Sequence, residues 1–304
     1  MSEITEIAWC DSTFNPWEGC QKVGPGCDHC YAEARNARFA GGGSAAPNWG
    51  PGAPRRRTSA SNWGEPAKWQ RRAEAFYAEH GRRQRVFCSS LADVFDNAVP
   101  IEWLRDLCSL IELTPDLRWL LLTKRIGNVF ERLIEARSHD WLAGRRNVSL
   151  GITVVNQTEA DRDIPKLLAT PARTRFLSIE PMLGPIDVVP YIHCDVGNAI
   201  DWVICGGESG PKARPMHPDW ARSLRDQCAA AGVPFLFKQW GEWIGADQDE
   251  CPWGPPASRW MWGDGIPFSY KGPAGSLPLM CRAGKARAGR LLDGVTHNDF
   301  PRTA

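Results

Sequence analysis

The chain has 304 residues, of which 43% are apolar and 23% charged, and its formal net charge at pH 7 is +1. This composition is typical of a folded globular protein and excludes a disordered or fibrous chain. No run approaches the roughly 20 apolar residues of a membrane span. The N-terminal MSEITEIAW lacks the basic and apolar pattern of a secretory signal. We therefore expect a cytoplasmic protein without membrane contact.

Short apolar runs rich in β-forming residues recur along the chain, and they are continuous rather than alternating, as in parallel strands buried on both faces. Helical patterns lie between them and begin and end with capping signals, for example at Pro218 and Gly232. The predicted strands are 6–10, 85–90, 118–124, 147–155, 175–180, 201–208 and 234–240. The predicted helices include 31–40, 100–115 and 217–232.

This alternation is compatible with an open doubly wound sheet or with a (β/α) barrel. Polar residues follow nearly every predicted strand, and in a barrel those strand ends converge on one mouth. We therefore expect an α/β protein with a full or partial (β/α) barrel over residues 1–242. Residues 40–84 form a predicted insertion rich in Gly, Pro and Arg, and residues 243–304 a predicted irregular Trp-rich cap with a basic helix at 284–294.

Three of the eleven cysteines, Cys20, Cys27 and Cys30, lie in one loop, GCQKVGPGCDHCYAE, at residues 19–33. We call this segment the three-Cys loop. The other cysteines are scattered, and the odd total argues against a disulfide framework. A closed zinc site requires a fourth ligand, and a redox CxxC pair leaves Cys20 unexplained. A [4Fe-4S] cluster held by three thiolates keeps one iron open for a small molecule.

Candidate functional side chains stand at the predicted strand ends. Glu180, Glu208 and Lys238 are predicted catalytic residues, because carboxylates and amines at a barrel mouth serve as general acids and bases. The predicted cofactor-binding residues are Ser89, Asp93, Thr123, Lys124, Asn156 and Trp240. Structural alternatives exist for several of them, such as salt bridges for the two glutamates and helix capping for Asp93.

The three-Cys loop after a first strand, ending in CxxCYAE, resembles the radical S-adenosylmethionine superfamily, and its CxxCY ending is similar to that of spore photoproduct lyases. The chain also resembles a phage- and prophage-encoded family of uncharacterised proteins marked by this motif. The matching blocks include NPWEGCQKVGPGCDHCYAE, LLLTKR, IEPMLGPID, IDWVICGGESGPKARPM, FKQWGEW and GKARAGRLLDG. The resemblance implies a barrel enzyme in which an iron–sulfur cluster binds S-adenosylmethionine.

The sequence thus predicts a radical S-adenosylmethionine enzyme that binds a [4Fe-4S] cluster through the three cysteines and receives electrons from an external donor. Residues 50–85 hold nine Lys or Arg and interleaved aromatics, which can grip phosphates and stack bases. This pattern favours a nucleic-acid base or nucleotide as substrate. The alternatives are a zinc-binding nucleic-acid module without catalysis, and a barrel hydrolase or transferase with a purely structural cluster.

Overall fold

The structure is a computed structural model that describes residues 5, 7–40, 45–138, 140–192, 199–245, 248, 260–261 and 280–301. Most of the predicted Trp-rich cap lies outside these residues. The chain forms two compact units, and we describe each by itself. The first unit comprises Met1–Ile152 and Lys166–Arg175, and the second comprises Thr153–Pro165 and Phe176–Ala304.

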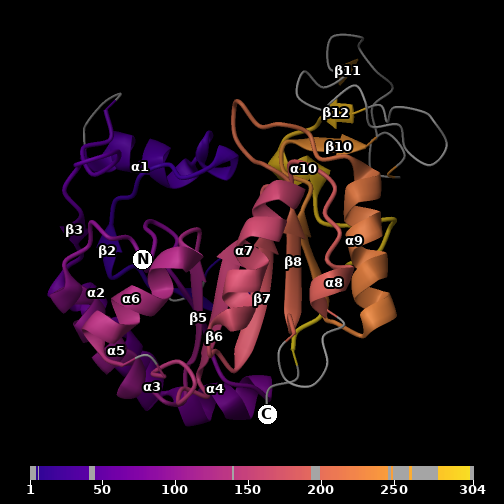
Figure 1. Cartoon of the computed structure of the whole chain (residues 1–304). Helices are drawn as coiled ribbons and strands as arrows, with labels where there is room; N and C mark the ends of the chain where they lie inside the picture. The colour runs from indigo at the N-terminus through magenta and orange to yellow at the C-terminus, as the bar shows by residue number, and fades with distance from the viewer. Residues whose placement is uncertain are drawn as a thin grey trace. The chain divides into compact units, whose positions relative to one another are not determined.

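The elements follow one another along the chain as β-strands and helices (Figure 1). The strands are β1 (Ser12–Thr13), β2 (Trp17–Glu18), β3 (Arg56–Arg57), β4 (Arg85–Cys88), β5 (Arg118–Thr123), β6 (Val148–Thr153), β7 (Thr174–Ile179), β8 (Trp202–Gly206), β9 (Phe235–Gln239), β10 (Trp243–Gly245), β11 (Trp260–Met261) and β12 (Met280–Arg282). The helices are η1 (Pro25–Cys27), α1 (Tyr31–Ala40), α2 (Ala60–Trp63), α3 (Glu65–Arg71), α4 (Ala73–His80), α5 (Ile101–Glu112), α6 (Ile126–Ala136), α7 (Gln157–Ala169), α8 (Val189–Ile192), α9 (Pro218–Ala231) and α10 (Lys285–Ala288).

In the first unit, β1, β4, β5 and β6 are parallel neighbours in that order. In the second unit, β7, β8 and β9 are parallel neighbours in that order, and β10, β12 and β11 form a small antiparallel sheet. The parallel strands are separated along the chain by helical crossovers. The fold is therefore mixed α/β, a partial (β/α) barrel, as the sequence predicts.

The apolar runs are buried because they supply the cores of the two units. In the first unit the rings of Phe14 and Trp119 meet edge to face, with centroids 5.7 Å apart. In the second, Phe176 and Trp202 pack at 5.7 Å. Helix α9 lies against β8 and β9 (Figure 1).

The first predicted strand is wrong in its position. The described residues of 6–10 form a turn, and the strand is β1, whose Ser12 pairs with Val86 of β4. Asp11 fixes this register, because its carboxylate accepts the backbone N–H of Arg85 at 2.7 Å and pairs with Arg82 at 2.6 Å. The predicted basic helix at 284–294 is also shorter than expected, since α10 ends at Ala288.

Among the described residues, no helix is both long enough and apolar enough to span a membrane.

Candidate functional site

The three-Cys loop leaves β2 through Gly19, whose φ is +108°. A Cβ at Gly19 would lie 2.5 Å from the carbonyl oxygen of Asn48, so glycine is required there for both reasons. The backbone of Cys20 then pairs with Trp49. Because of these contacts, Cys20 is fixed next to the start of the predicted insertion.

Cys27 and Cys30 lie at the far end of the loop. Cys27 is buried at the end of η1, and Cys30 is half-buried directly before the first residue of α1. Burial raises the pKa of the Cys30 thiol, and backbone N–H groups of Glu33 and Ala32, hydrogen-bonded to its sulfur, act in the opposite direction. The positive charge of Lys124 also lowers this pKa, and the nearby sulfur of Cys27 raises it. The N-terminus of α1 therefore favours a thiolate at Cys30.

Cys20 is held by a different partner. The Nη1 of Arg125 donates to the Cys20 Sγ at 3.4 Å, and the Nη2 of Arg125 donates to the carbonyl oxygen of Gln21 at 2.9 Å. Burial raises the pKa of the Cys20 thiol to about 11, and the Arg125 charge opposes this rise. The cation beside Cys20 thus favours negative charge on a sulfur that burial disfavours.

The three thiols do not form a site for a single metal ion. No group of three or more His, Cys, Asp or Glu side chains in the described part of the chain is arranged to hold one ion. The cysteine thiolates of an iron–sulfur cluster each bind a different iron atom, so they need not meet at one point.

The donor chemistry of the loop fits such a cluster. Cys20, Cys27 and Cys30 are free thiols. Beside Cys20, the Nη2 of Arg55 is buried and has no hydrogen-bond partner among the described residues. A buried donor without an acceptor destabilises a protein by about 1–3 kcal/mol. An acceptor atom on a bound group would hydrogen-bond this Nη2 and remove that unfavourable free energy.

Asp93 organises the predicted cofactor-binding residues of the first unit. Its carboxylate accepts the Thr123 hydroxyl at 2.7 Å and the Lys124 backbone N–H at 2.8 Å. The Ser89 hydroxyl donates to the carbonyl oxygen of Ala92 at 2.9 Å. Hydrogen bonds within the protein therefore engage the polar groups of Asp93, Thr123 and Ser89. Lys124 differs, because its half-buried ammonium makes no hydrogen bond or ion pair with described residues.

In the second unit, two predicted catalytic residues meet. The Lys238 Nζ lies 2.6 Å from the Glu180 Oε1, and the Gln239 amide donates to the same oxygen at 3.3 Å. Both side chains of the ion pair are just under one-fifth exposed. Glu180 therefore forms the salt bridge that its structural alternative expects, and the pair is partly exposed. The catalytic role of both residues stays a prediction.

The other three residues of the second unit have structural partners. Glu208 makes three hydrogen bonds to the backbone and guanidinium of Arg214, at 2.6 to 2.9 Å. Asn156 accepts the backbone N–H of Glu159 at 2.9 Å and so caps α7. Trp240 is 1% exposed and donates to the carbonyl oxygen of Leu291. The prediction that Trp240 stacks on a cofactor ring is wrong, because the indole is enclosed in the core.

The Gly-Gly-Glu at 206–208 has a packing explanation. A Cβ at Gly207 would lie 1.9 Å from the carbonyl oxygen of Trp240, and a Cβ at Gly241 would lie 2.1 Å from that of Glu208. The segments that follow β8 and β9 therefore touch backbone to backbone. No side chain fits between them, so the glycines serve this contact.

Three cations of the basic segment 50–85, namely Arg55, Arg56 and Arg57, have partners within the protein. Arg55 is buried against Asp96, Arg56 pairs with Glu18, and Arg57 pairs with Asp106 at 2.7 Å. The Arg57 guanidinium also lies over the Trp63 ring, 4.2 Å from its centroid. Each of the three cations thus has an internal partner. Part of the segment is helical, because α2, α3 and α4 lie within it.

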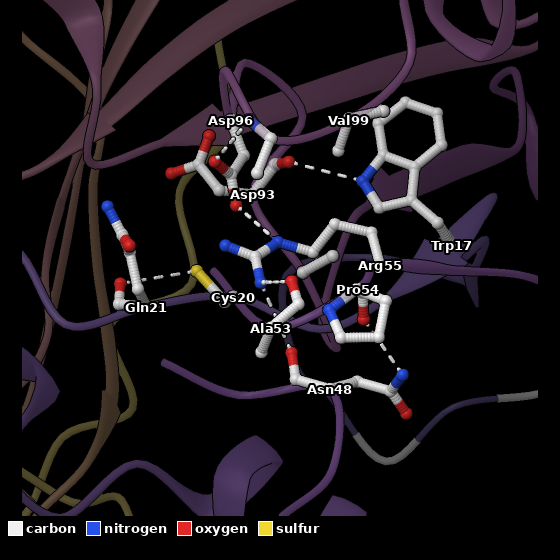
Figure 2. A network of polar contacts seen from close by, with 12 residues as sticks. Trp17, Cys20, Gln21, Asn48, Ala53, Pro54, Arg55, Asp93, Asp96 and Val99 are labelled. Carbon is white, nitrogen blue, oxygen red and sulfur yellow. Dashed lines mark hydrogen bonds and ion pairs between the residues drawn. The ribbon is translucent and has the colours of Figure 1, made fainter. Parts of the chain in front are cut away.

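Sequence reasoning missed the buried ion network around Arg55 and Arg125. Figure 2 shows the contacts of Arg55 in this network. Arg125 directly follows the predicted strand 118–124. This place at a strand end was the signal that could have identified it as a site residue. Arg55 carried no such signal, because an arginine in a Gly- and Pro-rich stretch is normally solvated.

Two solved structures resemble this chain at low sequence identity. A spore photoproduct lyase variant with a dinucleoside spore photoproduct is 11% identical, with a TM-score of 0.38 over 74% of this chain and 64% of that chain. A second variant, with bound AdoMet and the dinucleoside spore photoproduct, is 10% identical, with a TM-score of 0.37 over 92% and 73%. The chain spans less than two thirds of the first of these structures. No curated protein matches it.

The family comparison covers nearly the whole sequence. Residues 4–301 match the family described as "Protein of unknown function (DUF5131)", and they include the three-Cys loop. The chain belongs to this family.

Proposed function

We propose that the protein is an iron–sulfur enzyme of the radical S-adenosylmethionine type. The observation that carries the proposal is the three-Cys loop, in which free thiols stand beside a helix N-terminus at Cys30 and a buried arginine at Cys20. At both thiols, burial raises the pKa, and hydrogen-bond donors and positive charges beside the sulfur oppose that rise. Cys20, Cys27 and Cys30 would hold a [4Fe-4S] cluster.

The protein's own residues would orient and insulate this group. The first-turn amides of α1 hydrogen-bond the Cys30 sulfur, and Arg125 hydrogen-bonds the Cys20 sulfur. Lys124 brings a cation close to Cys30 without a partner of its own among the described residues, and it would bind an anionic group such as a carboxylate. When bound, a cluster of this type passes an electron from an external donor to S-adenosylmethionine and so starts radical chemistry.

The test is anaerobic purification and reconstitution of the full chain. We expect about four iron and four sulfide per chain, and 5′-deoxyadenosine once reductant and S-adenosylmethionine are added. Replacing Cys20, Cys27 or Cys30 by Ala should abolish iron binding. Cys108→Ala is the matched control, since Cys108 is a buried thiol of α5 in the same unit; it should retain the iron.

Other outcomes would contradict the proposal. One zinc and no iron per chain would favour the zinc-binding nucleic-acid module. Bound iron without cleavage of S-adenosylmethionine, together with turnover that needs no reductant, would favour an enzyme whose cluster is structural.

The proposed substrate is a nucleic-acid base or a nucleotide. Support comes from α1, which directly follows Cys30 and exposes Phe39 to 68%. The guanidinium carbons of Arg35 and Arg38 lie 5.4 and 5.1 Å from the centre of this ring. Arg35 also pairs with Glu18 at 3.3 Å, so Arg38 is the cation proposed to neutralise a phosphate while the exposed ring stacks a base. We therefore propose α1, in addition to the segment 50–85, as a surface that contacts nucleic acid.

A further inference from the structure

Arg125 contacts the three-Cys loop through two of its nitrogens. Nη1 reaches the Cys20 sulfur at 3.4 Å and Nη2 reaches the Gln21 carbonyl oxygen at 2.9 Å. One planar guanidinium therefore fixes both a side chain and the backbone directly after it. A planar guanidinium that makes two hydrogen bonds fixes its partners in one geometry, which a single hydrogen bond does not do.

Arg125 is itself held from several sides. Its Nη1 lies 3.2 Å from the Asp93 carboxylate, and its Nε lies 4.0 Å from that of Asp96. Its backbone N–H donates to the Thr123 hydroxyl at 2.8 Å. The Thr123 hydroxyl in turn donates to Asp93, so the same carboxylate fixes the backbone and the side chain of Arg125.

Arg55 completes the network from the insertion. Its Nε donates to Asp96 at 2.8 Å, and its Nη1 donates to the carbonyl oxygen of Ala53 at 2.8 Å. Figure 2 shows Asp93, Asp96 and Cys20 at the guanidinium end of Arg55. Two cations and two carboxylates thus balance in a buried place. Because their charges cancel, the network can stay buried while Arg125 turns one nitrogen to the sulfur.

We propose that Arg125 is the positioning residue of Cys20. It orients the sulfur and donates an N–H to it, and Asp93 and Asp96 hold Arg125 in place for that purpose. The inference rests on the proposed function in one respect, namely that Cys20 is a cluster ligand. A hydrogen-bond donor and a positive charge at a ligand sulfur stabilise the more negative, reduced cluster. Loss of such a second-shell partner typically weakens metal binding about 10–100-fold.

The test compares wild type with Arg125→Met and Arg125→Lys in the full chain. Arg132→Met is the matched control, because Arg132 is likewise a buried arginine, lies in α6 and donates to the Val99 carbonyl oxygen, with no contact to the three-Cys loop. The first measurement is hydrogen exchange of the three-Cys loop in the metal-free protein. The second is iron retention and reduction potential after reconstitution.

We expect Arg125→Met to speed amide exchange in the loop by at least about tenfold. It should also weaken iron retention and lower the reduction potential. Arg125→Lys should be intermediate, because lysine keeps the charge but not the fork. Arg132→Met should leave all three quantities at their wild-type values.

Unchanged exchange and potential in Arg125→Met would overturn the proposal, and so would an equal change in Arg132→Met, since that would indicate a general loss of stability. If wild type binds no iron, the proposed function fails. The exchange measurement then still decides whether Arg125 positions Cys20.

Discussion

The guanidinium of Arg55 lies against the carboxylate of Asp96, with 2.8 Å between Nε and Oδ2, and neither side chain is more than 3% exposed. The pair joins the predicted insertion to the segment after β4. Asp96 also accepts the backbone N–H of Ala98 at 3.0 Å. A buried charge pair with these additional hydrogen bonds anchors the insertion beside the three-Cys loop.

Arg55→Met should therefore reduce the free energy of unfolding by about 3–5 kcal/mol, because it leaves the buried Asp96 carboxylate without its hydrogen-bonded cation. Denaturant unfolding measures this. Arg56→Met is the control: Arg56 is over half exposed in its pair with Glu18, and a surface pair contributes at most about 1 kcal/mol. Adding Asp96→Asn to Arg55→Met should recover part of the loss. Equal effects at Arg55 and Arg56 would contradict this account.

Gly207→Ala should destabilise the second unit strongly. The new Cβ would lie 1.9 Å from the Trp240 carbonyl oxygen, and relief requires the backbone after β8 or β9 to move. Such overpacking costs about 1–3 kcal/mol or more. Thermal and denaturant unfolding would detect it. Gly127→Ala in α6 meets nothing within 4 Å and should stabilise by about 0.5–1 kcal/mol. A harmless Gly207→Ala would refute the close contact.

Asp293 should make stability depend on acid pH. Hydrogen bonds from Arg222 and Arg225 hold the pKa of Asp293 well below its ordinary value, with burial opposing them. A carboxylate with a depressed folded pKa contributes stability fully above its unfolded pKa, and loses it as pH falls through the folded value. Asp293→Asn should thus cost about 0.5–1 kcal/mol at pH 7, and this difference should shrink below about pH 4. A difference independent of pH would exclude the ionic origin.

The α1 surface should bind single-stranded oligonucleotides. Phe39→Ala should weaken binding roughly 5- to 150-fold, since stacking one base contributes about 1–3 kcal/mol. Arg38→Gln should make the dependence of log affinity on log salt shallower by about 0.7, the value for one phosphate of a single strand. Arg105→Gln removes the same charge from an exposed position on α5 and should change neither quantity. Salt-independent binding, or none, would count against a nucleic-acid substrate.

The sequence by itself determined the elements whose signals are local. Helix α9 begins at Pro218 and ends before Gly232 as expected, because proline fits the first turn and Gly232 adopts φ +67°. The apolar runs became parallel strands because burial on both faces requires such runs. The grouping of Cys20, Cys27 and Cys30 in one loop was equally visible, since it depends only on spacing.

Only the tertiary structure decided what each polar or aromatic side chain contacts. Arg55 looked like a solvated cation and is an internal partner of Asp96. Trp240 looked available for stacking and is enclosed. The first strand lies at Ser12–Thr13 because β4 and the Asp11 carboxylate set its register. In each case the deciding partner is distant along the chain, and burial and ion pairing depend on that partner rather than on neighbouring residues.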